Sequence, residues 1–147
     1  MNDKLRYVTK KKIGSGGMAV VYLAHDTVLG RDVAMKVLHP HLAESEKARK
    51  RFENEASAIA ALSHENIVKI YDFGISDEKC FLVMEYLTGS TVLEFIQKFA
   101  PVPNLILLSI CHQLFSGLHE AHSKGICHRD IKPSNLMIDK NGSVVSG

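Results

Sequence analysis

The sequence has little of what would indicate a secreted or membrane protein. Only three cysteines are present, Cys80, Cys111 and Cys127, and they lie far apart with no Cys-x-x-Cys pair. An odd number of scattered cysteines argues against both a disulfide framework and a zinc site. The most apolar stretch, residues 105–110, is far too short to cross a bilayer, and the first nine residues contain no apolar run. We therefore expect a cytoplasmic protein with neither a signal peptide nor a membrane anchor.

The sequence also lacks a strong excess of charge of either sign. Its 147 residues include 18 Lys and Arg against 16 Asp and Glu, and the formal net charge is +2. Because the basic residues are spread along the chain, they form no stripe of the kind that binds nucleic acid. Repeats and low-complexity segments are absent as well. With 46% hydrophobic residues, the composition indicates a folded, soluble domain and no more.

The first half of the chain has the pattern of a sheet with one helix. β-Branched and aromatic residues alternate in short segments bounded by turn residues, which predicts strands. These segments are residues 7–13, 20–24, 31–38, 68–73 and 80–86. After residue 40 the period changes, and positions i, i+3, i+7 and i+10 predict one face of a helix over residues 44–62. Those four positions are Phe52, Glu55, Ile59 and Leu62.

The second half of the chain, which follows a boundary at Gly89, is predicted to be mainly helical. We expect a short helix over residues 92–99, a break at two prolines, and a longer helix over residues 105–123 that ends at Gly125. In the longer helix, apolar residues recur at spacings of four and three and predict a broad buried stripe. The stripe consists of Leu107, Cys111, Leu114, Leu118 and Ala121. The tail is expected to form strands at residues 136–138 and 144–145, joined by a tight turn at Asn141-Gly142.

Three glycines lie between the first two predicted strands. Gly14, Gly16 and Gly17 lack β-carbons, so backbone N–H groups there can approach an anion closely, as in a phosphate-binding turn. A plain glycine hairpin explains them equally well. The Gly-x-Gly-x-x-Ala spacing also fits a dinucleotide fingerprint, for which Asp32 lies near the distance of a ribose-binding acid. That fold needs a helix directly after the glycines, whereas residues 20–23 are strand-forming, so we favour an antiparallel hairpin over a nucleotide.

A lysine and a glutamate form the next candidate pair. Lys36 lies on the third predicted strand and shares a face with Ala34 and Leu38, which places an ammonium group among apolar neighbours. Glu55 lies on the apolar face of the predicted helix, where an unpaired carboxylate would be costly. For each residue alone, a snorkelling lysine and a solvated glutamate are the alternatives. Together the two placements predict a Lys36–Glu55 ion pair.

The most specific stretch is residues 126–138, Ile-Cys-His-Arg-Asp-Ile-Lys-Pro-Ser-Asn-Leu-Met-Ile. It resembles the catalytic loop of protein kinases at every diagnostic position, and the Val-Ala-Met-Lys run that ends at Lys36 resembles the lysine motif of that family. A polar turn is the alternative, because Asp, Asn and Pro are common turn residues. The Gly-Gly-Met run at Gly16 and the Arg-Phe-x-x-Glu-Ala run at Arg51 are similar to those of bacterial kinases. A lysine two residues after Asp130 is typical of serine/threonine kinases.

The resemblance implies a fold and an activity. It implies an α+β protein-kinase-like fold. Residues 1–87 would form the small lobe, an antiparallel five-stranded sheet with one helix, together with the hinge. An incomplete helical large lobe with the catalytic loop would occupy residues 88–147. The implied reaction is transfer of the γ-phosphate of ATP, with Mg2+, to Ser or Thr of a protein substrate. A small-molecule kinase is a weaker alternative, because Lys-Pro-Ser-Asn after Asp130 is typical of kinases that act on proteins.

The same resemblance implies a role for each motif residue. Lys36 would hold the α- and β-phosphates of ATP, and Glu55 would pair with Lys36. Asp130 would orient and deprotonate the acceptor hydroxyl, Lys132 would neutralise the transferring phosphoryl group, and Asn135 would hold a magnesium ion.

The resemblance further implies which residues contact the nucleotide. Met84 would be the gatekeeper, while backbone groups of Glu85 and Leu87 would pair with adenine. Val21, Ala34 and Met137 would sandwich the ring, although any of them could belong to the core. The complete ATP-binding set is Ile13, Gly14, Ser15, Gly16, Gly17, Ala19, Val21, Ala34, Lys36, Met84, Glu85, Leu87 and Met137. Ala19 replaces the family's third glycine but keeps the backbone N–H.

The histidines have no further metal ligands nearby in the sequence. His39, His41, His119 and His122 are therefore interpreted as surface or hydrogen-bonded residues. His128 is expected to pack and hydrogen-bond within the loop.

The largest departure from the family lies at the end, where an Asp-Phe-Gly element and further helices would follow Gly147. Without that aspartate half of the metal site would be missing, so that ATP binding could survive while turnover is lost. An uncovered apolar stripe on the helix over residues 105–123 would then favour self-association. The hypotheses are thus a serine/threonine kinase, a catalytically inactive ATP-binding or partner-binding fragment, and an unstable fragment.

Overall fold

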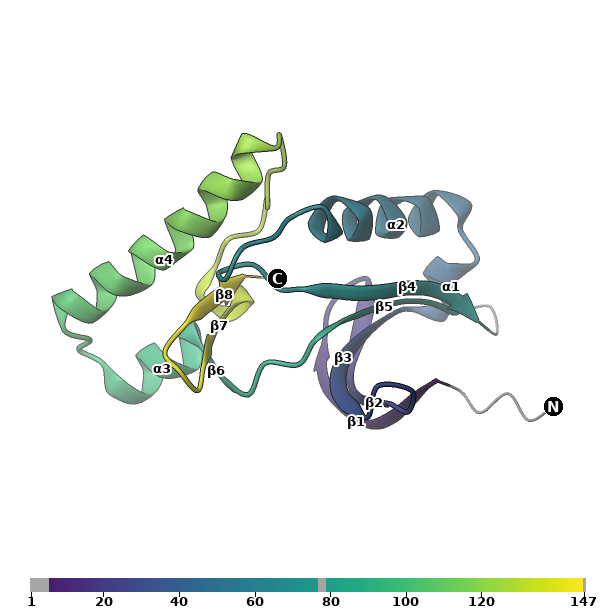
Figure 1. Ribbon diagram of the computed structural model, residues 1–147, viewed down its shortest axis with the longest axis horizontal. Coiled ribbons are helices and arrows are strands. Elements are labelled where there is room, and N and C mark those ends of the chain that lie inside the picture. Colours follow the sequence, from purple (N-terminus) through teal and green to yellow (C-terminus); the bar gives the residue numbers. More distant parts are fainter. Residues whose placement is uncertain (1–5, 77–78, 147) are drawn as a thin grey trace. The chain divides into compact units, whose positions relative to one another are not determined.

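The chain forms two compact units, seen in Figure 1. The computed structural model describes residues 6–76 and 79–146. The first unit contains the described residues up to Ala61 together with Lys69–Tyr86, and the second contains Leu62–Val68 and the described residues from Leu87 onward. The second unit therefore takes in a short segment from the first half of the chain. No helix in the described residues is both long and apolar enough to cross a membrane.

The first unit is built on an antiparallel sheet of five strands in the order β1-β2-β3-β5-β4. The strands are β1 (Tyr7–Ser15), β2 (Ala19–Asp26), β3 (Arg31–Leu38), β4 (Ile70–Ser76) and β5 (Lys79–Glu85). All five predicted strands are present, and β3 has the predicted bounds. The β1–β2 pair is longer than predicted because its pairing runs from Tyr7↔Asp26 to Ser15↔Val20. β4 begins later than predicted because Val68 belongs to the second unit, where its N–H donates to the Ser146 carbonyl oxygen.

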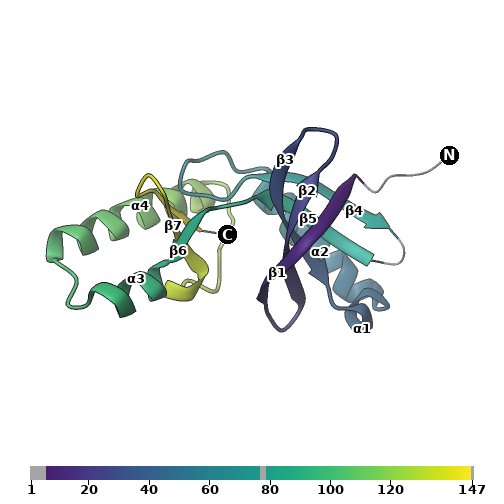
Figure 2. The ribbon, with the colours of Figure 1, turned by 90° about the horizontal axis from the view of Figure 1, so that it is seen from below.

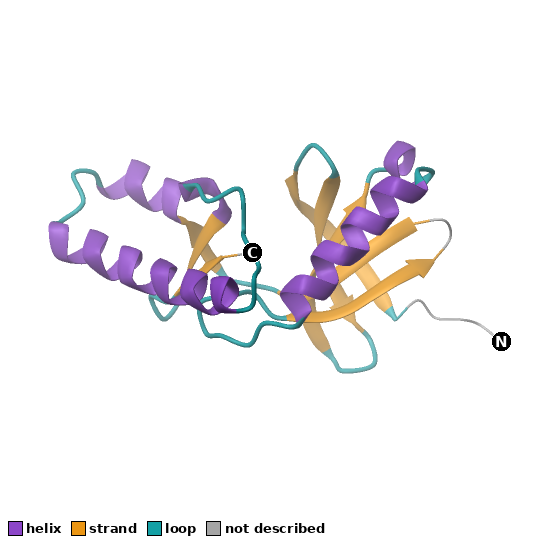
Figure 3. Ribbon diagram, turned by 90° about the horizontal axis from the view of Figure 1, so that it is seen from above, coloured by secondary structure: helices purple, strands orange, loops and turns teal. Residues whose placement is uncertain are grey.

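Two helices cover one face of this sheet (Figure 3). They are α1 (Pro40–Ala43) and α2 (Glu46–Ala60), where one helix over residues 44–62 was predicted. Ser45 separates them, because its hydroxyl accepts the Ala48 N–H and caps α2. Phe52 and Ala56 of α2 are buried in a cluster with residues of β2, β3 and β5. Burial of this apolar face stabilises the first unit and fixes the rotation of α2 on the sheet.

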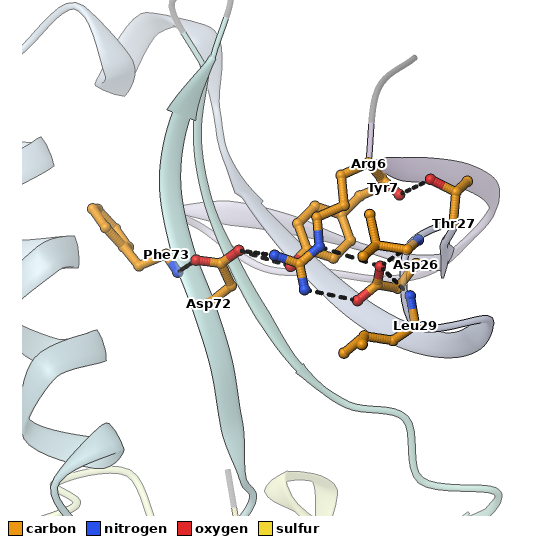
Figure 4. A network of polar contacts seen from close by, with 8 residues as sticks. Arg6, Tyr7, Asp26, Thr27, Leu29, Asp72 and Phe73 are labelled. Atoms are coloured by element: carbon orange, nitrogen blue, oxygen red, sulfur yellow. Dashed lines mark hydrogen bonds and ion pairs between the residues drawn. The ribbon is translucent and has the colours of Figure 1, made fainter. Parts of the chain in front are cut away.

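A polar network holds the start of β1 against β2 and β4 (Figure 4). Arg6 donates to both carboxylate oxygens of Asp26, at 3.2 and 3.0 Å, and to Asp72 at 3.3 Å. The Tyr7 hydroxyl donates to Asp72 at 2.7 Å. Asp26 is only 1% exposed and also accepts two N–H groups of the turn that follows β2. The hydrogen bond from Arg6 lowers the pKa of Asp26 to about 2, so Asp26 is an ionised acceptor at neutral pH.

The second unit combines a small sheet with two helices. Its sheet has the order β6-β7-β8, with β6 and β7 side by side in Figure 2. The elements are β6 (Gly89–Thr91), α3 (Val92–Phe99), α4 (Asn104–Ser123), a 3-10 turn (Pro133–Asn135), β7 (Leu136–Asp139) and β8 (Val144–Ser146). α3 has the predicted bounds, and α4 begins one residue earlier than predicted. The β7–β8 hairpin turns at Gly142, whose φ of 79° favours glycine.

The predicted buried stripe of α4 is partly wrong. Its buried residues are Ile110, Gly117 and Ala121, whereas Leu107 and Cys111 of the predicted stripe are exposed. At 3.6 residues per turn, the buried face is rotated by roughly 60° from the predicted one. α4 is therefore oriented by its contacts within the second unit rather than by its most apolar side.

A buried asparagine ties Leu62–Val68 to the second unit. The Asn66 side-chain amide donates to the Val144 carbonyl at 2.8 Å and to the Gln113 side-chain oxygen at 3.2 Å. Gln113 also accepts the Val144 N–H at 2.8 Å. A β-carbon on Gly117 of α4 would lie 3.1 Å from the Asn66 carbonyl oxygen. Satisfied buried hydrogen bonds and a small helical residue together fix this segment against α4 and β8.

Candidate active site

The glycine turn joins β1 to β2 and is closed by its own backbone. Gly14 pairs with Val21, and the Gly16 N–H donates to the Ala19 carbonyl at 2.9 Å. A strand and not a helix follows, so the turn does not have the structure of a dinucleotide-binding fingerprint. The Ala19 methyl group, at the family's third glycine position, is buried in the core of the first unit. It therefore does not fill the exposed side of the turn.

The glycines of this turn differ from the other described glycines. Three others have a positive φ: Gly30, Gly125 and Gly142. At three more, a β-carbon would be crowded by neighbouring atoms at 3.1 Å or less: Gly74, Gly89 and Gly117. At Gly14, Gly16 and Gly17, φ lies outside the left-handed region, and a β-carbon would meet nothing within 3.6 Å of the described structure. Neither a positive φ nor packing requires glycine there, which is compatible with a turn that a ligand approaches closely.

Lys36 and Glu55 lie within reach of each other in the first unit. The Lys36 ammonium is 3.5 Å from a carboxylate oxygen of Glu55 and 5.9 Å from the centre of the Phe52 ring. The expected burial of Glu55 is wrong, because its side chain is 54% exposed. Glu55 lies at the edge of the buried face of α2 that Phe52 and Ala56 define. An exposed pair of this kind adds little to stability, so its main effect is to orient the Lys36 side chain.

The residues expected around the adenine ring are divided between the units. In the first unit Ala34 of β3 pairs with Met84 of β5, and Val21 of β2 pairs with Lys36. The Glu85 N–H donates to the Lys69 carbonyl at 2.9 Å, so this N–H is already used within the first unit.

The remaining candidate residues for nucleotide binding lie in the second unit and in β1. Leu87 and Met137 belong to the second unit, where Met137 pairs with Thr91 and Val145. Ile13 and Ser15 lie in β1, and both are exposed beside the glycine turn.

Asp130, Lys132 and Asn135 come together in the loop before β7. The Asn135 amide nitrogen donates to the Asp130 carbonyl at 2.9 Å and to its carboxylate at 2.8 Å. The Lys132 ammonium is 3.4 Å from the same carboxylate oxygen. The hydrogen bond from Asn135, followed by that from Lys132, lowers the pKa of Asp130 below its ordinary value. Asp130 is therefore a carboxylate at neutral pH, able to accept a hydrogen bond from a hydroxyl group.

Backbone strain accompanies this loop. Among the non-glycine residues that the structure describes, Arg129 alone has a positive φ, 67°. Such a conformation costs about 1–3 kcal/mol and persists only where its surroundings impose it. The next N–H, of Asp130, donates to His128 Nδ1 at 3.2 Å, so His128 hydrogen-bonds within the loop as predicted. Strain next to an exposed carboxylate is typical of functional sites.

Asn135 also has an oxygen atom that can serve as a metal ligand. Its amide nitrogen is committed to Asp130, so the oxygen of the same amide is the atom directed elsewhere. Amide and carboxylate oxygens are the ligands that magnesium prefers. The Asn135 oxygen is thus suitable as a ligand for a hard cation.

An Asp-Phe-Gly tripeptide does occur in the chain, at residues 72–74, but it is part of β4. Asp72 accepts hydrogen bonds from Arg6 and Tyr7, as Figure 4 shows. Phe73 packs against the core, and a β-carbon on Gly74 would lie 2.6 Å from the Phe81 ring. The tripeptide thus has a structural role in the sheet, where the Asp72 carboxylate is occupied by Arg6 and Tyr7.

Comparisons with known proteins agree with these motifs. The chain is 43% identical over 139 residues to the serine/threonine-protein kinase PrkC of Bacillus subtilis, covering 95% of this chain and 22% of that protein. It is 38% identical over 139 residues to the serine/threonine-protein kinase PknL of Mycobacterium tuberculosis, of which it covers 35%. The chain therefore spans only a minor part of the length of these curated relatives.

Solved structures and a family model support the same conclusion. A crystal structure of the PknI kinase domain of Mycobacterium tuberculosis superposes with a TM-score of 0.82 at 27% identity. That match covers 97% of this chain and 58% of the solved one. The family model described as the protein kinase domain matches residues 7–145. By this match, and by the identity to bacterial serine/threonine kinases, the chain belongs to the protein kinase family.

Proposed function

We propose that the chain is the ATP-binding and catalytic-loop portion of a serine/threonine protein kinase, with a protein as the acceptor and no role in nucleic acid binding. The observation that carries this proposal is the glycine turn, where neither a positive φ nor packing accounts for the three glycines. The exposed backbone of such a turn can surround phosphate oxygens. The three free cysteines support a reducing, cytoplasmic location.

Each motif residue then has a defined task. Lys36, oriented by Glu55, would neutralise phosphate charge on ATP. In the loop before β7, the ionised Asp130 would accept the proton of the acceptor hydroxyl, and Lys132 would stabilise charge on the transferred group. Asn135 would hold Mg2+, which when bound would supply charge neutralisation of the phosphates.

The nucleotide proposal predicts a large effect of Lys36→Met on ATP binding. A hydrogen bond to a charged group contributes about 1.5–3 kcal/mol, so affinity for Mg-ATP should fall roughly 10- to 100-fold. Isothermal titration calorimetry on the purified chain measures this. Lys50→Met, on an exposed part of α2, is the matched control and should bind as the wild type does. Equal affinities for wild type and Lys36→Met would remove Lys36 from the nucleotide site.

A second candidate function, binding to another copy of this chain, is supported by α4. Opposite its buried face, Leu105, Leu108 and Phe115 lie on one side of the helix and are 80%, 65% and 63% exposed. Exposed large apolar residues on one helix face favour association. This exposed surface supports an alternative to the kinase, in which the chain binds ATP or a partner but does not catalyse phosphate transfer.

We therefore expect the purified chain to self-associate. Burying this face would remove apolar area from water in both copies, so a mass above 16.3 kDa should appear in light scattering at micromolar concentrations. Leu108→Asp with Phe115→Asp should return the chain to a monomer, while Val28→Asp, at an exposed apolar residue in the first unit, should not. A wild-type monomer that binds no hydrophobic dye would contradict the proposed association.

A further inference from the structure

His39 contacts the glycine turn at two points. Its backbone N–H donates to the Met18 carbonyl at 2.9 Å, and its ring Nε2 lies 2.9 Å from the Gly16 carbonyl oxygen. From the sequence His39 was interpreted as a surface or hydrogen-bonded residue, and the structure shows it hydrogen-bonded. Its partner lies 23 positions away, in the turn expected to bind phosphate.

The contact with Gly16 defines the state of the imidazole. A carbonyl oxygen only accepts hydrogen bonds, so Nε2 must carry the hydrogen and donate it. The Gly16 carbonyl and the Gly17 N–H belong to one planar trans peptide and point in opposite directions. Holding the carbonyl toward His39 therefore directs the Gly17 N–H away from His39, and no acceptor for that N–H is found within residues 6–76 and 79–146.

The surroundings of His39 keep the imidazole in place. Leu38, which precedes it, is fully buried at the end of β3, and Pro40, which follows it, begins α1. A residue before proline is restricted to extended conformations, and His39 has φ −58° and ψ 141°. Its ring also stacks on His41 at a centroid distance of 5.7 Å and an angle of 17°. Backbone and ring are thus both positioned by contacts within the chain itself.

We propose that His39 is a positioning residue for the phosphates of a bound nucleotide: by holding the Gly16 carbonyl, it orients the Gly17 N–H toward a phosphate oxygen. The phosphate part of this inference rests on the proposed ATP binding. The hydrogen bond itself does not, because both of its partners belong to this chain.

The first test needs no nucleotide. Nitrogen-15 NMR of the histidine rings in the unliganded chain should show His39 with hydrogen on Nε2. The signal is assigned by its loss in His39→Gln. A neutral His39 ring with hydrogen on Nδ1 alone could not donate to Gly16 and would overturn the proposal.

The second test compares ATP with adenosine. His39→Leu, which removes the donor, should weaken ATP binding about three- to tenfold, the effect of one neutral hydrogen bond, and leave adenosine binding unchanged. His39→Gln, whose amide N–H can reach the same carbonyl, should bind both ligands nearly as the wild type does. Calorimetry gives the six affinities of wild type and the two variants for the two ligands, and circular dichroism shows that each variant is folded.

The outcomes separate this inference from the proposed function. Unchanged ATP affinity in His39→Leu, or an equal loss for ATP and adenosine, would reduce His39 to a structural role and overturn the inference alone. A wild-type chain that binds ATP no more tightly than adenosine would refute phosphate recognition itself, and with it the proposed function.

Discussion

Gly89→Ala is expected to disrupt the sheet of the second unit while leaving the first unit folded. A β-carbon at Gly89 would lie 1.9 Å from the Ile138 carbonyl oxygen and 2.9 Å from its carbonyl carbon. These are backbone atoms of β7, which is paired on both sides, to β6 and to β8, so they cannot move aside as a flexible side chain would. Relief requires separation of β6 from β7. We expect the free energy of unfolding of the second unit to fall by about 3 kcal/mol, at the upper end of typical overpacking effects.

Hydrogen exchange followed by mass spectrometry checks this expectation. Protection should fall in β7 and β8 and persist in β1–β5, because the two units have separate cores. Gly17→Ala is the matched control, since a β-carbon there would meet nothing within 4 Å, and it should keep protection throughout. Unchanged protection of β7 in Gly89→Ala would show that β6 does not hold this sheet together.

The sequence predicts most elements correctly because their signals are local. Alternation of β-branched residues identified all five strands of the first sheet, and glycines and prolines marked most ends. β6 was not predicted, because its three residues are a strand only through pairing with β7. The buried face of α4 was predicted wrongly because residues 105–108 are all apolar, so they do not indicate which side of the helix is buried. The contact between Gly117 and Asn66 decides the orientation, and that contact spans distant parts of the chain.

The candidate site likewise contains some residues that the sequence identifies and others that it does not. Lys36, Asp130 and Asn135 could be named as candidates because each lies in a short motif whose chemistry is carried by neighbours in sequence. The ionised state of Asp130 also follows from nearby residues, Asn135 and Lys132. His39 could not be predicted, because a ring that contacts a carbonyl 23 positions away leaves no periodic pattern. The exposure of Glu55 was missed because helical periodicity alone places Glu55 on the same face as Phe52.

The largest effect is expected in phosphoryl transfer. The 147-residue chain alone should phosphorylate a protein acceptor at least about 10²–10³-fold more slowly than a version extended through a complete large lobe. Asn135 is the single metal ligand assigned among the motif residues, and the Asp-Phe-Gly tripeptide in β4 is committed to Arg6, Tyr7 and the core. Kinase chemistry depends on positioning the γ-phosphate while its charge is neutralised, and one ligand cannot hold both metal ions. Asp130 then has little to act on.

In the extended version, Asp130→Asn should lower the transfer rate by about 10²–10⁴, because a neutral amide cannot accept the hydroxyl proton. Asp32→Asn is the matched control: this exposed carboxylate of β3 pairs with Lys10, and its loss should leave the rate unchanged. The measurement is incorporation of radiolabelled phosphate from ATP into a generic basic protein, with all chains at equal concentration. If the short chain transferred phosphate at the rate of the extended one, and Asp130→Asn abolished that transfer, the 147 residues would be a complete catalyst. The need for a second metal-binding aspartate would then be refuted, while the role of Asp130 as the proton acceptor would stand.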